Sequence, residues 1–164
     1  MPAPPNAFVS QLPFVSDRIG AVAIYCSDGR YNEQFDEFLH SRLKLPRYDR
    51  LVVPGGPGVM AGHVAAYREE EAILEQLKFL IQHHELERVV LISHRGCGFY
   101  LNKLMVPAHR LRRQQEVDLS SAAQRIQGIS RTVSVEPYIA EAAEGRVKID
   151  PAPPISGDDA TAFW

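Results

Sequence analysis

The stretch AVAIYCSDGR, residues 21–30, decides the fold class of this chain. Its first six residues are almost all apolar, as a parallel strand covered on both faces requires. Cys26, Asp28 and Arg30 follow at alternate positions where the apolar run stops. We therefore predict a buried strand whose carboxyl end carries a thiol and two opposite charges.

Strand and helix patterns alternate through the rest of the chain. Short apolar runs and a terminal alternating segment predict further strands at 51–53, within 87–98 and at 146–150. Apolar residues at helical spacing predict helices, with Asn32 capping the first and Gly145 ending the last. The predicted helices cover residues 31–43, 63–84, 112–131 and 137–145.

This alternation predicts an α/β fold, with a mostly parallel central sheet of about four to five strands flanked by helices. The 164 residues suit one domain, which we place at 18–164. Residues 1–17 contain four prolines and little periodicity, so we expect an extended arm that needs a surface such as a partner subunit to lie on. The tail from residue 151 is expected to be irregular.

The composition is that of an ordinary globular protein. Hydrophobic residues make up 45% and charged residues 23%, and the formal net charge is −2, so no general attraction to nucleic acid or anionic lipid is expected. No apolar run is long enough to span a bilayer, and the N-terminal residues resemble no secretion signal. We expect a cytoplasmic protein.

Cys26 and Cys97 are too few for a secreted disulfide framework. Two such cysteines either bind metal, do chemistry or are inert buried side chains. In an open parallel sheet ligands bind beyond the carboxyl ends of the strands, where these cysteines and His94 are expected to converge. Two thiolates and one imidazole are ligands that suit zinc. We therefore predict that the single domain at 18–164 binds zinc.

Three protein ligands leave a fourth position on a tetrahedral ion. Asp28 either ligates zinc directly and closes the site, or is held away by Arg30, which leaves room for a water whose pKa the ion lowers. An aspartate and an arginine two residues apart also make an ordinary structural ion pair. The sequence leaves these three readings open.

C-x-D-x-R after the first strand and H-x-x-C-G after the third resemble the β-class carbonic anhydrases, over about residues 19–150. The resemblance implies that Cys26, His94 and Cys97 are zinc ligands and that Asp28 and Arg30 form the catalytic dyad that admits or replaces a metal-bound water. It implies reversible hydration of carbon dioxide to bicarbonate by a zinc-bound hydroxide. It also implies a homodimer or higher homo-oligomer with active sites near the subunit interface.

One loop departs from that family. VVPGGPG, residues 52–58, stands where many members have a turn resembling R-N-A-G that helps to line the pocket. The backbone N–H groups of Gly55, Gly56 and Gly58 are able to hold an anion such as bicarbonate, although a plain tight turn also explains a glycine cluster. We therefore treat these glycines as a candidate substrate loop.

Other functions fit the same residues. A zinc hydrolase of this scaffold acting on carbonyl sulfide or carbon disulfide is one alternative, and a structural or regulatory zinc protein with Asp28 permanently on the metal is another. A third alternative needs no metal, because Cys97 between two glycines and near Arg95 suits a low-pKa thiolate in a redox or phosphate-handling enzyme.

Overall fold

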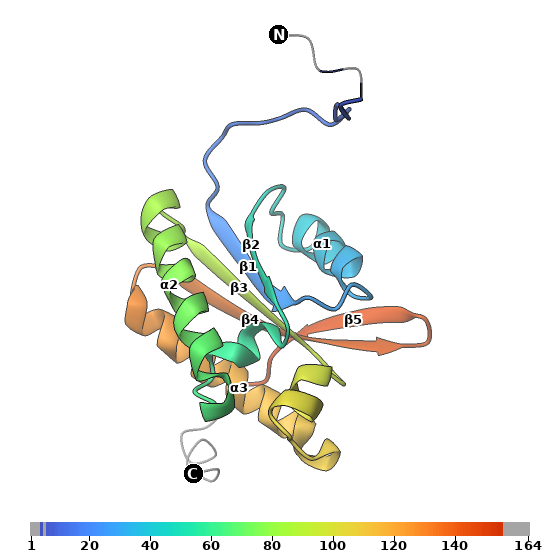
Figure 1. Ribbon diagram of the computed structural model, residues 1–164, viewed down its shortest axis with the longest axis vertical. Coiled ribbons are helices and arrows are strands. Elements are labelled where there is room, and N and C mark those ends of the chain that lie inside the picture. The colour runs from blue at the N-terminus through green and yellow to red at the C-terminus, as the bar shows by residue number, and fades with distance from the viewer. Residues whose placement is uncertain (1–3, 5, 156–164) are drawn as a thin grey trace.

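The computed structural model describes residues 4 and 6–155, and a five-stranded sheet lies at its centre (Figure 1). The strands stand in the order β2-β1-β3-β4-β5. The first four run parallel, and β5 pairs antiparallel with β4, which confirms the predicted α/β class with a mostly parallel sheet. The strands are β1 (Ala21–Cys26), β2 (Asp49–Val53), β3 (Arg88–His94), β4 (Ser134–Ala143) and β5 (Arg146–Pro151).

Helices cover both faces of the sheet (Figure 1). Side chains of β1 alternate between the faces, as successive residues of a strand must. Val22 and Ile24 join the core formed with α2 and α3, while Ala23 and Tyr25 join the core formed with α1. The helical elements are α1 (Asn32–Ser41), η1 (Gly56–Met60), η2 (Val64–Ala66), α2 (Tyr67–His84), η3 (Phe99–Lys103) and α3 (Ala108–Ile129).

The parallel register brings the carboxyl ends of three strands to one edge of the sheet. Cys26, the last residue of β1, lies opposite Val53, the last residue of β2. On the other side Tyr25 lies opposite Ile92, so β3 reaches its end at His94 close to the end of β1. The loops after these strands therefore meet, as the sequence predicted.

The helix predicted for residues 137–145 is wrong, because this segment lies in strand β4 and the turn after it. Alanine and glutamate have high intrinsic helix propensity, but pairing with β3 and β5 on both sides overrides a preference of this size. Glu144 and Gly145 both have positive φ, at 52° and 74°, which is the geometry of a tight turn between antiparallel strands. Gly145 therefore ends no helix and instead turns a hairpin.

Other boundaries differ by a few residues. Tyr31, and not Asn32, occupies the N-cap position of α1, and its side chain makes no capping bond. The predicted 63–84 helix begins with the short η2 turn before α2. In the arm and up to Gly20 the described residues form no helix or strand, and Figure 1 shows them running away from the sheet. Of the tail predicted to be irregular, residues 156–164 lie outside the described residues.

Among the described helices, none combines the length and the apolar character that crossing a bilayer demands.

Candidate metal centre

Cys26, His94 and Cys97 come together at the carboxyl edge of the sheet. Cys26 ends β1, His94 ends β3, and Cys97 follows in the turn after β3. One ligand atom from each residue lies within 4.8 Å of those of the other two, and the sulfurs of Cys26 and Cys97 are 3.9 Å apart. All three side chains are buried. The predicted convergence of these three residues is therefore present.

The ring of His94 is oriented for ligation through one nitrogen. Its Nδ1 atom lies 3.0 Å from the carbonyl oxygen of Arg95. A carbonyl only accepts hydrogen bonds, so Nδ1 carries the proton and Nε2 keeps a free lone pair. Nε2 is buried and has no hydrogen-bond partner among the described residues. Buried polar atoms are rarely left unpaired, and a lone pair held in this way is what a metal-binding histidine offers.

The two thiols share one negative charge more readily than they carry two. A hydrogen bond between the sulfurs lowers the pKa of Cys26, because the thiol of Cys97 stabilises the thiolate. The same hydrogen bond, together with burial, raises the pKa of Cys97. A divalent cation would relieve this conflict, since thiolates are its ligands. Two cysteine sulfurs and one imidazole nitrogen at this spacing therefore fit a zinc ion, with one tetrahedral position left over.

Asp28 is bound by Arg30. One carboxylate oxygen accepts hydrogen bonds from Nε of Arg30 at 2.9 Å and from its backbone N–H at 3.1 Å, and the other accepts from Nη2 at 2.6 Å. This bidentate pairing lowers the pKa of Asp28 to about 2. Asp28 is not part of the closely spaced ligand group. The pairing fits both the reading in which Arg30 holds Asp28 away from the fourth position and that of an ordinary ion pair, and the role of Asp28 toward a metal stays a prediction.

The glycine cluster after β2 packs tightly against the centre. A side chain at Gly56 would place its Cβ 2.7 Å from the backbone nitrogen of Cys26, and one at Gly58 would overlap the hydroxyl of Tyr100. The backbone N–H of Gly58 donates to the carbonyl of Gly55 at 3.1 Å. The N–H of Gly58 is thus already engaged, and anion binding by this loop stays a prediction.

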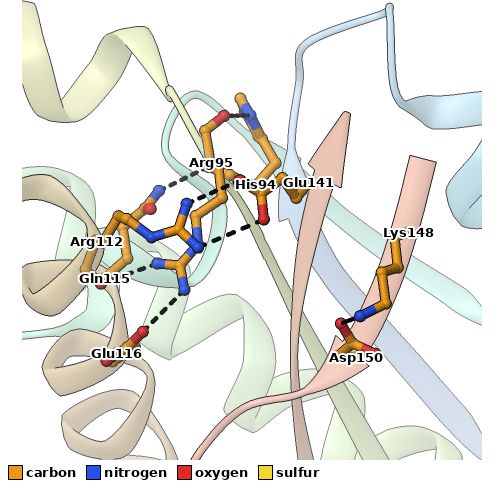
Figure 2. A network of polar contacts seen from close by, with 8 residues as sticks. All are labelled: His94, Arg95, Arg112, Gln115, Glu116, Glu141, Lys148 and Asp150. Carbon is orange, nitrogen blue, oxygen red and sulfur yellow. Dashed lines mark hydrogen bonds and ion pairs between the residues drawn. The ribbon is translucent and has the colours of Figure 1, made fainter. Parts of the chain in front are cut away.

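The sequence did not predict two residues that contact His94, which are Gln115 and Tyr31. The side-chain amide of Gln115, on α3, donates to the backbone carbonyl of His94 at 2.6 Å and is fully buried (Figure 2). On the other side, the ring of Tyr31 stacks on the imidazole with centroids 4.4 Å apart. Neither residue belongs to a motif. Gln115 falls within a predicted helix and Tyr31 at the start of another, and helical periodicity alone carries no sign of either contact.

Arg95 ties the turn after β3 to α3. Its guanidinium donates to the carbonyl of Arg112 at 2.9 Å and pairs with Glu116 at 2.8 Å, and Arg112 in turn pairs with Glu141 on β4 (Figure 2). The Arg95 side chain is only 13% exposed, so these contacts are shielded from solvent. They hold the Arg95 side chain against α3 and so fix the backbone between His94 and Cys97.

Several solved structures share this fold. Over 87% of this chain and 88% of its own, the β-carbonic anhydrase isoform I of Trichomonas vaginalis superposes with a TM-score of 0.55 at 9% identity. The β-carbonic anhydrase CafD of Aspergillus fumigatus gives a TM-score of 0.52 at 12% identity, over 79% and 87% of the two chains. One of two tetrameric β-carbonic anhydrases of Sordaria macrospora gives 0.51 at 14%, over 80% of each.

Sequence comparison identifies the family. Comparison with curated proteins finds no match. A family model described as "Putative carbonic anhydrase" matches residues 16–148, which include all three clustered side chains and both members of the Asp28–Arg30 pair. Because this match spans most of the chain and the structure has the fold of the β-class enzymes, the chain belongs to the carbonic anhydrase family, as a divergent member with the β-class architecture.

Proposed function

We propose that this protein is a zinc-dependent carbonic anhydrase, a lyase that reversibly hydrates carbon dioxide to bicarbonate. The observation that carries the proposal is the buried Nε2 atom of His94, which has no hydrogen-bond partner in residues 4 and 6–155 and lies beside two cysteine sulfurs 3.9 Å apart. Family membership supports it, because the clustered side chains fall inside the matched segment.

Cys26, His94 and Cys97 would hold the zinc ion. Bound zinc supplies Lewis-acid chemistry that lowers the pKa of a water molecule to about 7. The protein's own residues prepare the site for this chemistry. The carbonyl of Arg95 fixes the proton of His94 on Nδ1, and Gln115 holds the backbone of His94 in place.

In this proposal the Asp28–Arg30 pair acts on the water molecule. Arg30 keeps Asp28 ionised, since the pKa of Asp28 falls to about 2. A carboxylate oxygen has two lone pairs, so Asp28 is able to accept one more hydrogen bond while it stays paired with Arg30. In this account Asp28 orients the attacking water and Arg30 keeps Asp28 off the open ligand position. The loop of Gly55, Gly56 and Gly58 closes the site on the side of β2.

We also propose that residues 18–164 form one zinc-binding domain and that the protein works as a homodimer or a higher homo-oligomer. The arm exposes large apolar side chains, with Phe8 91%, Leu12 81% and Phe14 93% exposed. Apolar groups of this size favour burial, and a partner subunit offers the surface that the arm lacks in one chain. The tetrameric enzymes from Sordaria macrospora have the same fold.

Stopped-flow hydration of carbon dioxide tests the proposal. The zinc-loaded protein is expected to accelerate hydration over the buffer rate across neutral to alkaline pH. The Cys97→Ser variant is expected to lose that acceleration, while Arg68→Gln, which alters an exposed arginine of α2, keeps it. Hydrolysis of carbonyl sulfide without hydration of carbon dioxide, or zinc binding without either activity, would contradict the proposal.

A further inference from the structure

We propose that a second cavity, between Gly62–His63 and helix α3, binds a small singly charged carboxylate. The cavity encloses about 600 Å³ and is lined on its α3 wall by Asp118, Ser121 and Arg125 among others. None of the three proposed zinc ligands lines it. The cavity is therefore distinct from the proposed metal centre.

The first element of this site is a histidine held by a buried carboxylate. Nε2 of His63 lies 2.6 Å from one oxygen of Asp118, and the amide of Gln114 donates to the other oxygen at 2.7 Å. The side chain of Asp118 is only 3% exposed, and each of its oxygens accepts one of these hydrogen bonds, as a buried polar group requires. The proton of His63 therefore sits on Nε2, and its Nδ1 has no hydrogen-bond partner among the described residues.

The second element is an arginine held by another buried carboxylate. Nη1 of Arg125 pairs with Glu70, whose other oxygen accepts the backbone N–H of Gly62 at 2.9 Å. Glu70 is buried, whereas the Arg125 side chain is 43% exposed and its Nη2 makes no further bond within the described chain. Gly62 has φ of +89°, and a Cβ there would lie 2.5 Å from Nη2 of Arg125. The glycine thus leaves room for the guanidinium at the cavity wall.

Hydrogen-bond donors that line the cavity indicate which class of ligand it binds. Beside Arg125, the hydroxyl of Ser121 and the amide of Gln124 line the same cavity without a hydrogen bond to any described residue. Hydrogen bonding to Asp118 raises the pKa of His63, which favours a second N–H on its Nδ1. An arginine fork, an imidazolium, a hydroxyl and an amide are all able to donate, so they suit an oxyanion.

The charges on the cavity walls favour a monoanion over a dianion as the ligand. Asp118 and Glu70 each already neutralise one cation, so the walls carry about one negative charge for each positive charge. A dianion such as phosphate would meet two nearby carboxylates without enough positive charge to offset them. A planar monoanion has the two oxygens that a guanidinium binds side by side. A small monocarboxylate therefore fits this site best.

The test is an acetate titration of the purified protein, followed through the imidazole NMR signals of His63. The His63→Gln variant identifies these signals by their disappearance. We expect them to shift with saturation, and chloride at equal ionic strength to produce no saturating shift. Arg125→Gln should weaken acetate binding by about tenfold or more, because it removes a hydrogen bond to a charged group. Arg68→Gln, which changes an exposed arginine of α2, should leave binding unchanged.

Because Arg125 also pairs with Glu70, its loss could disturb the fold. Ser121→Ala and Gln124→Ala avoid this problem, since neither side chain bonds another described residue. The double variant should weaken acetate binding by about threefold or more. A linear shift with acetate, equal binding of acetate by the folded Arg125→Gln protein, or unchanged binding in the double variant would each overturn the proposal. Stronger saturation by inorganic phosphate than by acetate would also overturn it.

Discussion

Nδ1 of His94 lies 3.0 Å from the carbonyl oxygen of Arg95, and this contact decides which ring nitrogen faces the two cysteines. With the proton fixed on Nδ1, the buried Nε2 is left as a lone-pair donor. The backbone that makes this contact is itself held by the amide of Gln115 and by the ion pair of Arg95 with Glu116. The metal centre thus depends on helix α3 as well as on the strand ends that carry its ligands.

The Gln115→Met variant tests this dependence. It keeps the volume of the side chain but leaves the carbonyl of His94 buried without its donor, which is expected to cost about 1–3 kcal/mol of unfolding free energy. It should also weaken zinc binding by about tenfold or more, as loss of an outer-shell contact does. Urea unfolding and competition with a zinc chelator measure the two effects. Gln127→Met, an exposed position on the same helix, is the matched control and should change neither.

Removing the arginine beside Asp28 should change the chemistry of the site more than its stability. In Arg30→Gln the pKa of Asp28 is expected to rise from about 2 toward the ordinary value for aspartate, because the bidentate partner is gone. The unfolding free energy should change by less than about 1 kcal/mol, since the Arg30 side chain is 81% exposed. Carboxyl-carbon NMR titration of Asp28 gives the pKa. An unchanged value would refute the role assigned to Arg30.

The close approach of the glycine loop predicts a contrast among glycine variants. A Cβ at Gly56 would lie 2.7 Å from the backbone nitrogen of Cys26, and the backbone there has φ of +52°. Gly56→Ala is therefore expected to lower the unfolding free energy by about 1–3 kcal/mol. Gly29→Ala meets no atom within 4 Å and serves as the control. Thermal and urea unfolding should separate the two, and equal stability would contradict the packing described.

The His63–Asp118 pair makes stability depend on pH with a definite sign. Hydrogen bonding to Asp118 raises the pKa of His63 above 6.5, so the folded state binds the proton more tightly than the unfolded state. The stabilisation is complete below about pH 6.5 and is lost as the pH rises through the folded pKa. His63→Gln should therefore cost more stability at about pH 6 than at about pH 9. The exposed His109→Gln variant should show no such difference, and an equal cost at both pH values would contradict the pairing.

The sequence alone predicted the ligand cluster because topology brings strand ends together. Cys26 and His94 end apolar runs, and the parallel order of β1 and β3 places those ends side by side. The supporting contacts escaped prediction, since the bond from Gln115 depends on where α3 packs. Strand β4 was not predicted from the sequence for a related reason. Its alanines and glutamates favour a helix locally, and only pairing with β3 and β5 makes them a strand.

The central claim is that Cys26, His94 and Cys97 hold zinc. The most direct test is zinc content per chain together with X-ray absorption at the zinc edge, on protein purified without added metal or chelator. We predict about one zinc per chain, with two sulfur ligands near 2.3 Å and a nitrogen ligand near 2.0–2.1 Å. The Cys97→Ser variant should lose this zinc. Protein that takes up no zinc after reduction and reloading, or a Cys97→Ser variant that binds it equally well, would contradict the account.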